Sequence, residues 1–206
     1  LEQGDRLPKE AVLVERLGAG RSTVREAMKL LQSRNIVRIK QGSGTYVASN
    51  PGVADDPLGF TFIGDKQRLA RDLLEVRFMI EPQMASLAAE HATEDQIMCI
   101  RELCDESQRL AEAGKDYSAA DTAFHNAIAE SCGNLVVPRL MGVLKASVPL
   151  FIDVTGKKLV EETIRTHRGV ADAIEARNPT AAHDAMYLHL VYNRNMIAEG
   201  AQAKSE

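Results

Sequence analysis

The stretch Leu17-Gly18-Ala19-Gly20-Arg21-Ser22-Thr23-Val24-Arg25-Glu26-Ala27 contains the end of one short amphipathic segment, a glycine-rich break and the start of a second amphipathic segment. Its glycines favour a break, because glycine is the residue that tolerates tight-turn backbone angles best. A short helix is predicted to begin at Leu7-Pro8-Lys9-Glu10, with Pro8 tolerated near the first turn, and a second helix spans about residues 22–33. The apolar side of the first is predicted to be Val12, Leu13 and Leu17, and that of the second Val24, Ala27, Leu30 and Leu31. Two short helices joined by a glycine turn predict a helix-turn-helix.

A β-hairpin is predicted directly after the second helix. The residues on both sides of Gln41-Gly42-Ser43-Gly44 favour strands, and the glycines allow a tight turn between them. The two strands are Ile36-Val37-Arg38-Ile39-Lys40 and Thr45-Tyr46-Val47. A helix-turn-helix followed by a hairpin is a winged helix, which places its second helix in the major groove of DNA.

The charge of the chain is unevenly distributed. Residues 1–48 contain nine Lys or Arg and five Asp or Glu, a net charge of +4, whereas residues 49–206 contain sixteen and twenty-four, a net charge of −8. A basic head on an acidic body indicates that the head binds a polyanion. No signal peptide and no long apolar segment is present in the sequence, so no membrane span and a cytoplasmic location are expected.

Residues 65–200 are predicted to form an all-α antiparallel bundle, separated from the head (1–48) by a linker at 49–64. The linker contains the turn-forming sequences Asn50-Pro51-Gly52 and Asp55-Asp56-Pro57. Thr93-Glu94-Asp95-Gln96 has the form of a capping box. The predicted helices span about 66–91 with a kink at Pro82, 93–113, 118–132, 136–151 with strain at Pro149, 160–177 and 180–198. A chain of mainly α class with a small hairpin follows.

Four potential metal ligands are predicted to face the interior of this bundle. Asp121 and His125 are four residues apart, so both lie on one face of a helix. His167 and His189 stand on the apolar stripes of two further helices. Buried polar groups are costly unless satisfied, and a shared divalent metal ion would satisfy all four.

Simpler interpretations of these residues are available. Ser118-Ala119-Ala120-Asp121 has the form of a capping box, so Asp121 could cap its own helix. Any one buried histidine is more often hydrogen-bonded than metal-bound. His91 and His183 are expected at helix ends or on the surface. The three cysteines form no CxxC pair and are expected to be free thiols, with Cys132 a small core residue.

The head resembles the GntR family of bacterial transcription regulators. The resemblance rests on Gly4-Asp5-Arg6-Leu7-Pro8, Leu17-Gly18, Arg21–Ala27, Leu30-Leu31 and Gly42-Ser43-Gly44-Thr45-Tyr46-Val47. It implies that Arg21, Ser22, Thr23 and Arg25 contact DNA, with Gly42 at the wing tip near the minor groove. Ala11 stands where the family usually has a DNA-contacting arginine, and Gly20 stands where it has Ser or Thr. The family's first helix would precede Leu1, so truncation or disorder is expected there.

The body resembles the FCD effector-binding domain of the FadR-like GntR subfamily. The resemblance rests on Asp72-Leu73-Leu74-Glu75-Val76-Arg77 with Glu81, Ala88-Ala89, Asp121-x-x-Phe124-His125, Asn134, His167 and His189-Leu190. It implies that Asp121, His125, His167 and His189 bind a divalent ion. One oxygen and three nitrogen ligands suit zinc, nickel or manganese, and geometry alone does not choose between them. Zinc is the expected ion, with nickel or manganese as alternatives.

A small organic or sugar acid is the expected effector. A carboxylate with an adjacent hydroxyl could chelate the open positions of the ion. In the domain that the body resembles, an arginine at the position of Arg77 commonly lies at the effector pocket, and its planar fork suits a carboxylate. An ion pair with Glu81 is the alternative for this arginine. Asn134 and Asn193 are further candidates.

The expected function is therefore a ligand-responsive, sequence-specific transcription regulator, most simply a repressor, located in the bacterial cytoplasm at the nucleoid. A homodimer on a pseudo-palindromic double-stranded operator is expected, because one winged helix reads few base pairs. A metal-responsive regulator is one alternative, and a metal-dependent hydrolase is another. The chain has no HExxH motif and no nucleophile elbow, which disfavours the enzyme.

Overall fold

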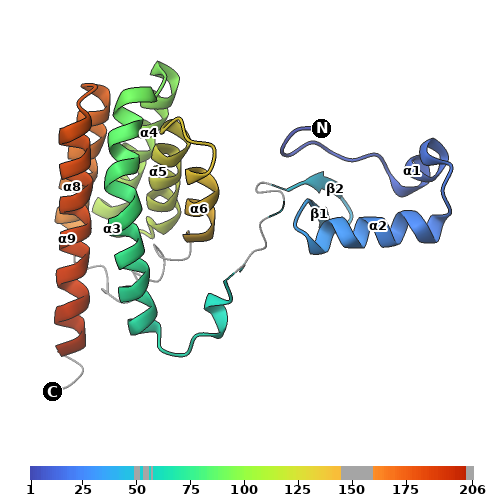
Figure 1. Cartoon of the computed structure of the whole chain (residues 1–206), viewed down its shortest axis with the longest axis horizontal. Coiled ribbons are helices and arrows are strands. Elements are labelled where there is room, and N and C mark those ends of the chain that lie inside the picture. The colour runs from blue at the N-terminus through green and yellow to red at the C-terminus, as the bar shows by residue number, and fades with distance from the viewer. Residues whose placement is uncertain (49–51, 53–55, 57, 145–159, 203–206) are drawn as a thin grey trace. The chain divides into compact units, whose positions relative to one another are not determined.

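The computed structural model describes residues 1–48, 52, 56, 58–144 and 160–202. The chain divides into two compact units, Leu1–Gly59 and Phe60–Glu206 (Figure 1). The division falls within the segment that the sequence predicts as a linker. Most of the predicted turn residues of that segment lie outside the described residues.

The N-terminal unit is a winged helix-turn-helix, as predicted. Helix α1 (Glu10–Leu17) ends at Gly18, whose left-handed conformation (φ 61°) closes the helix. Helix α2 (Arg21–Ser33) follows after three residues. Strands β1 (Val37–Lys40) and β2 (Gly44–Val47) then form an antiparallel hairpin, in which Val37 pairs with Val47 and Lys40 with Gly44.

The segment before α1 extends this hairpin, which the sequence analysis did not anticipate. The backbone N–H of Leu7 donates to the carbonyl of Thr45 at 2.8 Å, and that of Val47 donates to the carbonyl of Asp5 at 2.9 Å. Arg6 and Tyr46 form an isolated antiparallel bridge. Residues 4–7 therefore cover the free edge of β2.

The core of the head differs in part from the predicted one. Val24, Met28 and Val37 are buried, while the predicted core residues Ala27 and Leu30 are exposed. The i, i+4, i+7 positions counted from Val24 carry the stripe, which leaves Ala27 and Leu30 on its flank. In α1 the inward residues are Leu13 and Val14, whereas Val12 and Leu17 are exposed.

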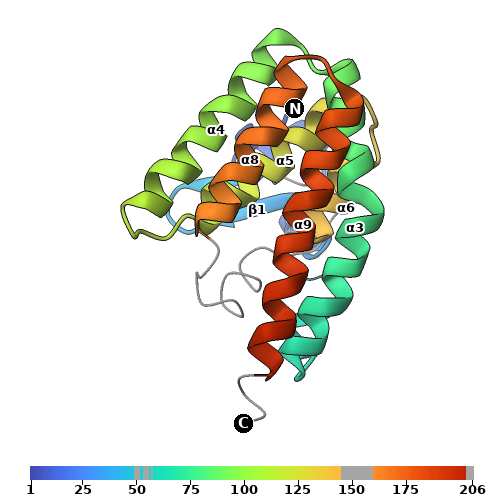
Figure 2. The same ribbon diagram turned by 90° about the vertical axis from the view of Figure 1, so that its left-hand side faces the viewer.

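The second unit is a helical bundle, as predicted (Figures 1 and 2). In the part that the structure describes, the α-helices are α3 (Lys66–His91), α4 (Glu94–Glu112), α5 (Ser118–Ser131), α6 (Val137–Leu144), α8 (Val160–Glu175) and α9 (Pro179–Gln202), preceded by a 3-10 turn, η1 (Phe60–Phe62). Helix α3 packs along α9, α8 packs against α9 and α4, and α4 packs against α5. Pro82 lies inside α3 without ending the helix. The predicted helix at 136–151 is described only as far as Leu144, so Pro149 lies outside the described residues.

Two capping boxes were predicted in the bundle, one at the start of α4 and one at the start of α5. The capping box at Thr93 is confirmed, since Thr93 Oγ1 accepts from the N–H of Gln96 and Gln96 Oε1 accepts from that of Thr93. The capping box proposed at Ser118 is wrong. The N-cap of α5 is Tyr117, and the N–H of Ser118 donates to Asp116 Oδ1 at 3.0 Å. Asp121 therefore has no capping role.

The bundle core is apolar and continuous around α5. Phe124 and Ile128 are fully buried, and Cys132 is buried as the predicted small core residue. Cys99, Cys104 and Cys132 are free thiols. This core surrounds the polar residues that α5 also carries on its inner face.

Candidate metal centre and DNA-binding surface

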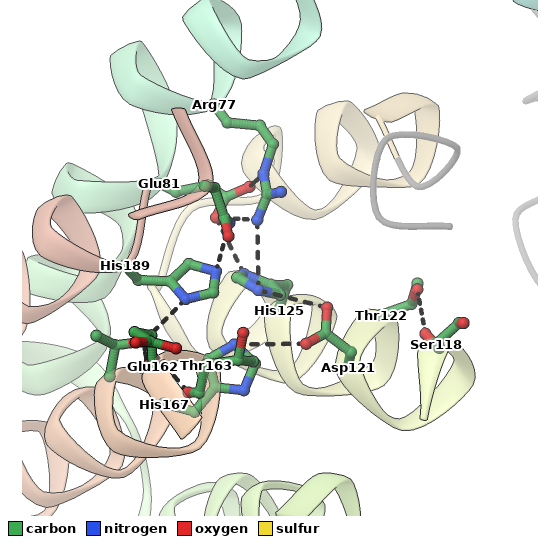
Figure 3. Close-up of polar contacts among 12 residues, drawn as sticks. Arg77, Glu81, Ser118, Asp121, Thr122, His125, Glu162, Thr163, His167 and His189 are labelled. Carbon is green, nitrogen blue, oxygen red and sulfur yellow. Dashed lines mark hydrogen bonds and ion pairs between the residues drawn. The ribbon is translucent and has the colours of Figure 1, made fainter. Parts of the chain in front are cut away.

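Four polar side chains converge in the interior of the bundle (Figure 3). Asp121 and His125 come from α5, His167 from α8 and His189 from α9, and each is at most 5% exposed. The ring centroids of His167 and His189 are 4.6 Å apart, and that of His125 is 5.3 Å from both. The structure thus brings together all four residues that the sequence analysis selected.

The distances within this cluster are those of a compact donor set. One nitrogen from each of the three imidazoles lies within 4.8 Å of the others. Asp121 Oδ1 is 3.5 Å from His167 Nε2, and Asp121 Oδ2 is 3.9 Å from His125 Nε2. Phe124 stacks at a tilt on His167, with ring centroids 4.5 Å apart, and so closes one side of the cluster.

Two of the ring nitrogens lack a hydrogen bond. Among the described residues, His125 Nδ1 and His167 Nε2 are fully buried and have no hydrogen-bond partner. Leaving a buried polar atom unsatisfied costs about 1–3 kcal/mol. One carboxylate and three imidazoles are also ligands that zinc, nickel and manganese accept. The residues present therefore fit a divalent metal ion.

Burial keeps the imidazoles of His167 and His189 in the form that binds metals. Burial lowers the pKa values of His167 and His189 well below the ordinary value of histidine, so both rings are neutral at pH 7 and carry a lone pair. Burial also raises the pKa of Asp121, with the charge of Glu81 acting in the same direction. A bound cation would reverse that shift by stabilising the carboxylate.

A buried ion pair from α3 borders the cluster. Arg77 Nε donates to Glu81 Oε1 at 2.6 Å, and Arg77 Nη2 donates to Glu81 Oε2 at 3.2 Å. Arg77 Nη2 is also 3.4 Å from His125 Nε2, and Glu81 Oε2 lies 3.0 Å from His125 Nδ1, off the direction of a hydrogen bond. Burial alone would raise the pKa of Glu81, but the neighbouring charges of Arg77 and His125, together with the hydrogen bonds from Arg77, lower it to about 2.

The ion pair that was the alternative for Arg77 is therefore present, and it lies beside the proposed ligands. The contact between Glu81 and His125 was not predicted from the sequence. The spacing of Arg77 and Glu81 on one helix face indicated their mutual contact, but only the packing of α3 against α5 brings them to the histidine.

The two asparagines predicted for the effector site lie in different surroundings. Asn193 is buried, and its Nδ2 is 3.1 Å from His189 Nε2. Asn134 is exposed, and its Oδ1 accepts from the N–H groups of Val136 and Val137 at 2.8 and 3.3 Å. Asn134 therefore caps the start of α6, because its carboxamide satisfies N–H groups that the helix cannot. The structure brings Asn193, but not Asn134, to the histidines.

The remaining histidines lie outside the cluster. His91 is the last residue of α3 and is half-exposed. His183 pairs with Asp184 at 3.1 Å and stacks on Tyr187. Both positions match the prediction of surface or helix-end residues.

The residues predicted to contact DNA are displayed by α2 and the wing. Arg21, Ser22, Thr23 and Arg25 occupy the first turns of α2, and all four are exposed. Arg25 Nε is 3.8 Å from Glu10 Oε2, with both side chains at least half-exposed. Gly42 lies in the hairpin turn with φ 75°. Arg6 braces this turn by donating from Nη2 to the carbonyl of Ser43 at 2.5 Å.

A winged helix with exposed arginines on its second helix, followed in the same chain by a helical bundle, defines a two-unit DNA-binding protein. Residues 1–47 match the model of bacterial regulatory proteins of the gntR family, and residues 72–192 match the FCD domain. The chain belongs to the GntR family of bacterial transcription regulators, in the group that carries an FCD domain.

Relatives with known roles agree with this assignment. The chain is 31% identical to the transcriptional regulator LutR of Bacillus subtilis, over 96% of this chain and 94% of LutR. It is 29% identical to the Uxu operon regulator of Haemophilus influenzae, over 91% and 71% of the two chains. It is 27% identical to the transcriptional repressor NanR of Escherichia coli K12, over 91% and 74%. The chain is accordingly a DNA-binding transcription regulator and not an enzyme.

Solved structures show the same architecture. A GntR protein of Streptococcus agalactiae is 38% identical, with a TM-score of 0.78 over 94% of this chain and 91% of that one. McbR/YncC of E. coli shares the fold at 19% identity, with a TM-score of 0.56 over 97% and 89%. In the described part of the chain, no helix is both long and apolar enough to cross a membrane.

Proposed function

We propose that this regulator is a homodimeric repressor whose bundle holds a divalent metal ion and binds a small carboxylate-bearing metabolite, which changes its affinity for the operator. The observation that carries this proposal is the buried cluster of Asp121, His125, His167 and His189, with two unsatisfied ring nitrogens.

The DNA-binding step is assigned to the start of α2 and to the wing. The exposed side chains of Arg21 and Arg25 suit phosphates and guanine edges, and the hydroxyls of Ser22 and Thr23 suit phosphates. The N-terminus of α2 has no side-chain cap, which leaves its N–H groups available to an anion. Gly42 allows the wing to approach the backbone of DNA closely.

The metal is assigned to Asp121, His125, His167 and His189, with zinc preferred and nickel or manganese as alternatives. When bound, the ion would supply a Lewis-acidic point that attracts oxygen donors. The four residues come from three helices, so metal binding would be coupled to the folding of the bundle.

The effector is assigned to the same interior. An acid with a carboxylate and an adjacent hydroxyl would match a hard cation with open coordination positions. Asn193, buried beside His189, offers an amide for a further oxygen. Arg77 offers positive charge, but Glu81 already accepts from its Nε and Nη2. The effector carboxylate would therefore accept a hydrogen bond from Arg77 Nη1, the guanidinium nitrogen that does not donate to Glu81.

The dimer and the repression are inferred from a relative and from the geometry of operator binding. NanR is a repressor by name, and its likeness to this chain covers both units. A single winged helix reads few base pairs, and a C₂ dimer doubles the site on a pseudo-palindromic operator. The effector acts on DNA binding only if it prefers one arrangement of the dimer.

Calorimetry on the metal-loaded protein tests this function. A panel of hydroxy and sugar acids is titrated into the parent, Arg77→Ala and His189→Ala, with the exposed-residue variant Arg71→Ala as the control. We expect at least one acid to bind the parent and Arg71→Ala equally, and the other two variants at least tenfold more weakly. A neutral or cationic metabolite as the tight ligand, or equal binding of acids without metal, would overturn the effector assignment. A change of operator affinity on metal addition alone would instead identify a metal-responsive regulator.

A further inference from the structure

We propose that Thr166 is a positioning residue that sets the tautomer of His189 and thereby prepares its Nε2 to bind the metal. This inference rests on the metal site of the proposed function. It assigns a role to a residue next to His167 on α8 that acts on a ligand from α9.

The first observation is a buried contact between the two helices. Thr166 Oγ1 lies 3.1 Å from His189 Nδ1, and the two residues are 4% and 3% exposed. Because both residues are buried, solvent competes little for the hydrogen bond between them. A threonine hydroxyl offers one hydrogen to donate and two lone pairs that accept.

The second observation shows where the hydroxyl hydrogen goes. Thr166 Oγ1 donates to the backbone carbonyl of Glu162, one turn earlier in α8, at 2.7 Å. The carbonyl of Thr163, at 3.2 Å, is a second acceptor on the same side. With its only hydrogen directed at the helix backbone, the hydroxyl oxygen faces His189 as an acceptor.

The protonation of His189 follows from this direction. Its Nδ1 must carry the hydrogen in order to donate to Thr166, and the neutral ring then has its lone pair on Nε2. Asn193 Nδ2 is 3.1 Å from that Nε2 and donates to its lone pair while no metal is bound, so a metal ion at Nε2 would displace this amide. The bonds from Asn193 to His189, from His189 to Thr166, and from Thr166 to the Glu162 carbonyl all run in one direction.

For the metal site, the consequence is that His189 already has its lone pair on Nε2, the nitrogen that would bind the metal. A metal-binding histidine usually donates its other ring N–H to a fixed acceptor, which sets the tautomer and orients the ring. In this chain a threonine, held by its own helix, supplies that acceptor. Thr166 also directly precedes the ligand His167 in the sequence. One turn of α8 therefore supplies one proposed ligand and the hydrogen-bond acceptor of another.

The test compares metal affinities of matched threonine variants. Zn²⁺ dissociation constants are measured by competition with a chelating dye for the parent, Thr166→Val, Thr166→Ser and Thr122→Val. Valine keeps the shape and removes the hydroxyl, while serine keeps the hydroxyl. Thr122 is the control, because its hydroxyl donates in the same way to the carbonyl of Ser118 at 2.8 Å and lies on α5.

We expect Thr166→Val to bind Zn²⁺ about 10- to 100-fold more weakly, and Thr166→Ser and Thr122→Val to remain within about threefold of the parent. Unchanged affinity of Thr166→Val, or an equal loss in Thr122→Val, would overturn the inference.

A second readout, on the chelator-treated protein, separates this inference from the proposed function. Nitrogen-15 spectra of the imidazoles should show His189 protonated at Nδ1 in the parent and a mixture of tautomers in Thr166→Val. A parent with the Nε2–H tautomer would refute the role of Thr166 even if zinc binds. A parent that binds no metal but shows the Nδ1–H tautomer would refute the metal site, and with it the role of Thr166 in metal binding, while leaving Thr166 as the residue that sets the tautomer of His189.

Discussion

Arg77 and Glu81, one turn apart on α3, form an ion pair that is almost completely removed from water, with 2.6 Å between Nε and Oε1. The pair stands beside His125 and so links α3 to the donor cluster formed by α5, α8 and α9. The pair places one positive and one negative charge beside the donor cluster before any ligand binds.

Removing one member of this pair should destabilise the protein strongly. Glu81→Leu leaves an unpaired guanidinium in the interior, which we expect to cost about 3–5 kcal/mol. The double variant Arg77→Met/Glu81→Leu should recover a large part of that loss, because no uncompensated charge remains. Urea unfolding of the metal-free proteins measures both. Single and double variants of equal stability would contradict the importance of the pairing.

Metal removal should lower the melting temperature. An ion that binds only the folded state adds about 2.7 kcal/mol when its free concentration is 100 times its dissociation constant. A chelator should therefore lower the melting temperature of the parent, and His167→Ala should lose that sensitivity. His183→Ala, which changes a histidine outside the cluster, serves as the control. Elemental analysis that finds no metal, before or after incubation with zinc, nickel and manganese, would refute the site.

Loss of the arginines on α2 should weaken DNA binding and its dependence on salt. Each phosphate contact that is removed should reduce the slope of log K against log salt by about 1. Arg21→Ala/Arg25→Ala is compared with Arg71→Ala/Arg109→Ala, which removes two exposed charges from the bundle unit instead. Fluorescence anisotropy at several salt concentrations gives both slopes. If the α2 variant keeps the parent's affinity and slope, these arginines do not contact DNA.

The oligomeric state can be measured without an effector. Sedimentation velocity should give twice the chain mass of 22.5 kDa at concentrations that saturate the operator. A symmetric operator should bind two chains, and an isolated half-site should bind much more weakly. A monomer at operator-binding concentrations would contradict the proposed dimer.

The turn after α5 offers a test of local packing. Gly133 has φ 73°, and a Cβ there would lie 3.0 Å from the ring of His91. Gly114 has a similar φ of 65°, but a Cβ there would meet no atom within 4 Å. Both alanine variants should lose about 1–2 kcal/mol from backbone strain, and Gly133→Ala should lose more. Thermal unfolding measures these losses. Adding His91→Ala to Gly133→Ala should remove only the part of the stability loss by which Gly133→Ala exceeds Gly114→Ala. An equal loss at both glycines would show that His91 moves aside at no cost.

Much of the architecture was determined by local patterns in the sequence. The glycines around Ala19 and the turn at Gly42 fix a helix-turn-helix and hairpin, because they act within a few residues. The spacing of Asp121 and His125 put both on the buried face of one helix for the same reason. Even the apolar stripe of α2 was only partly predictable, since Met28 rather than Ala27 and Leu30 is buried once α1 and β1 pack against it.

The tertiary structure decided which distant residues share the interior. Periodicity gives the direction of a side chain around its own helix but not its height against a neighbour, so it could not pair Thr166 with His189 or Glu81 with His125. It also could not separate Asn193 from Asn134. The packing of α9 against α8 buries Asn193 beside a histidine, while the start of α6 engages Asn134 as a cap. Contacts between helices depend on the burial of whole faces, which no short stretch of sequence specifies.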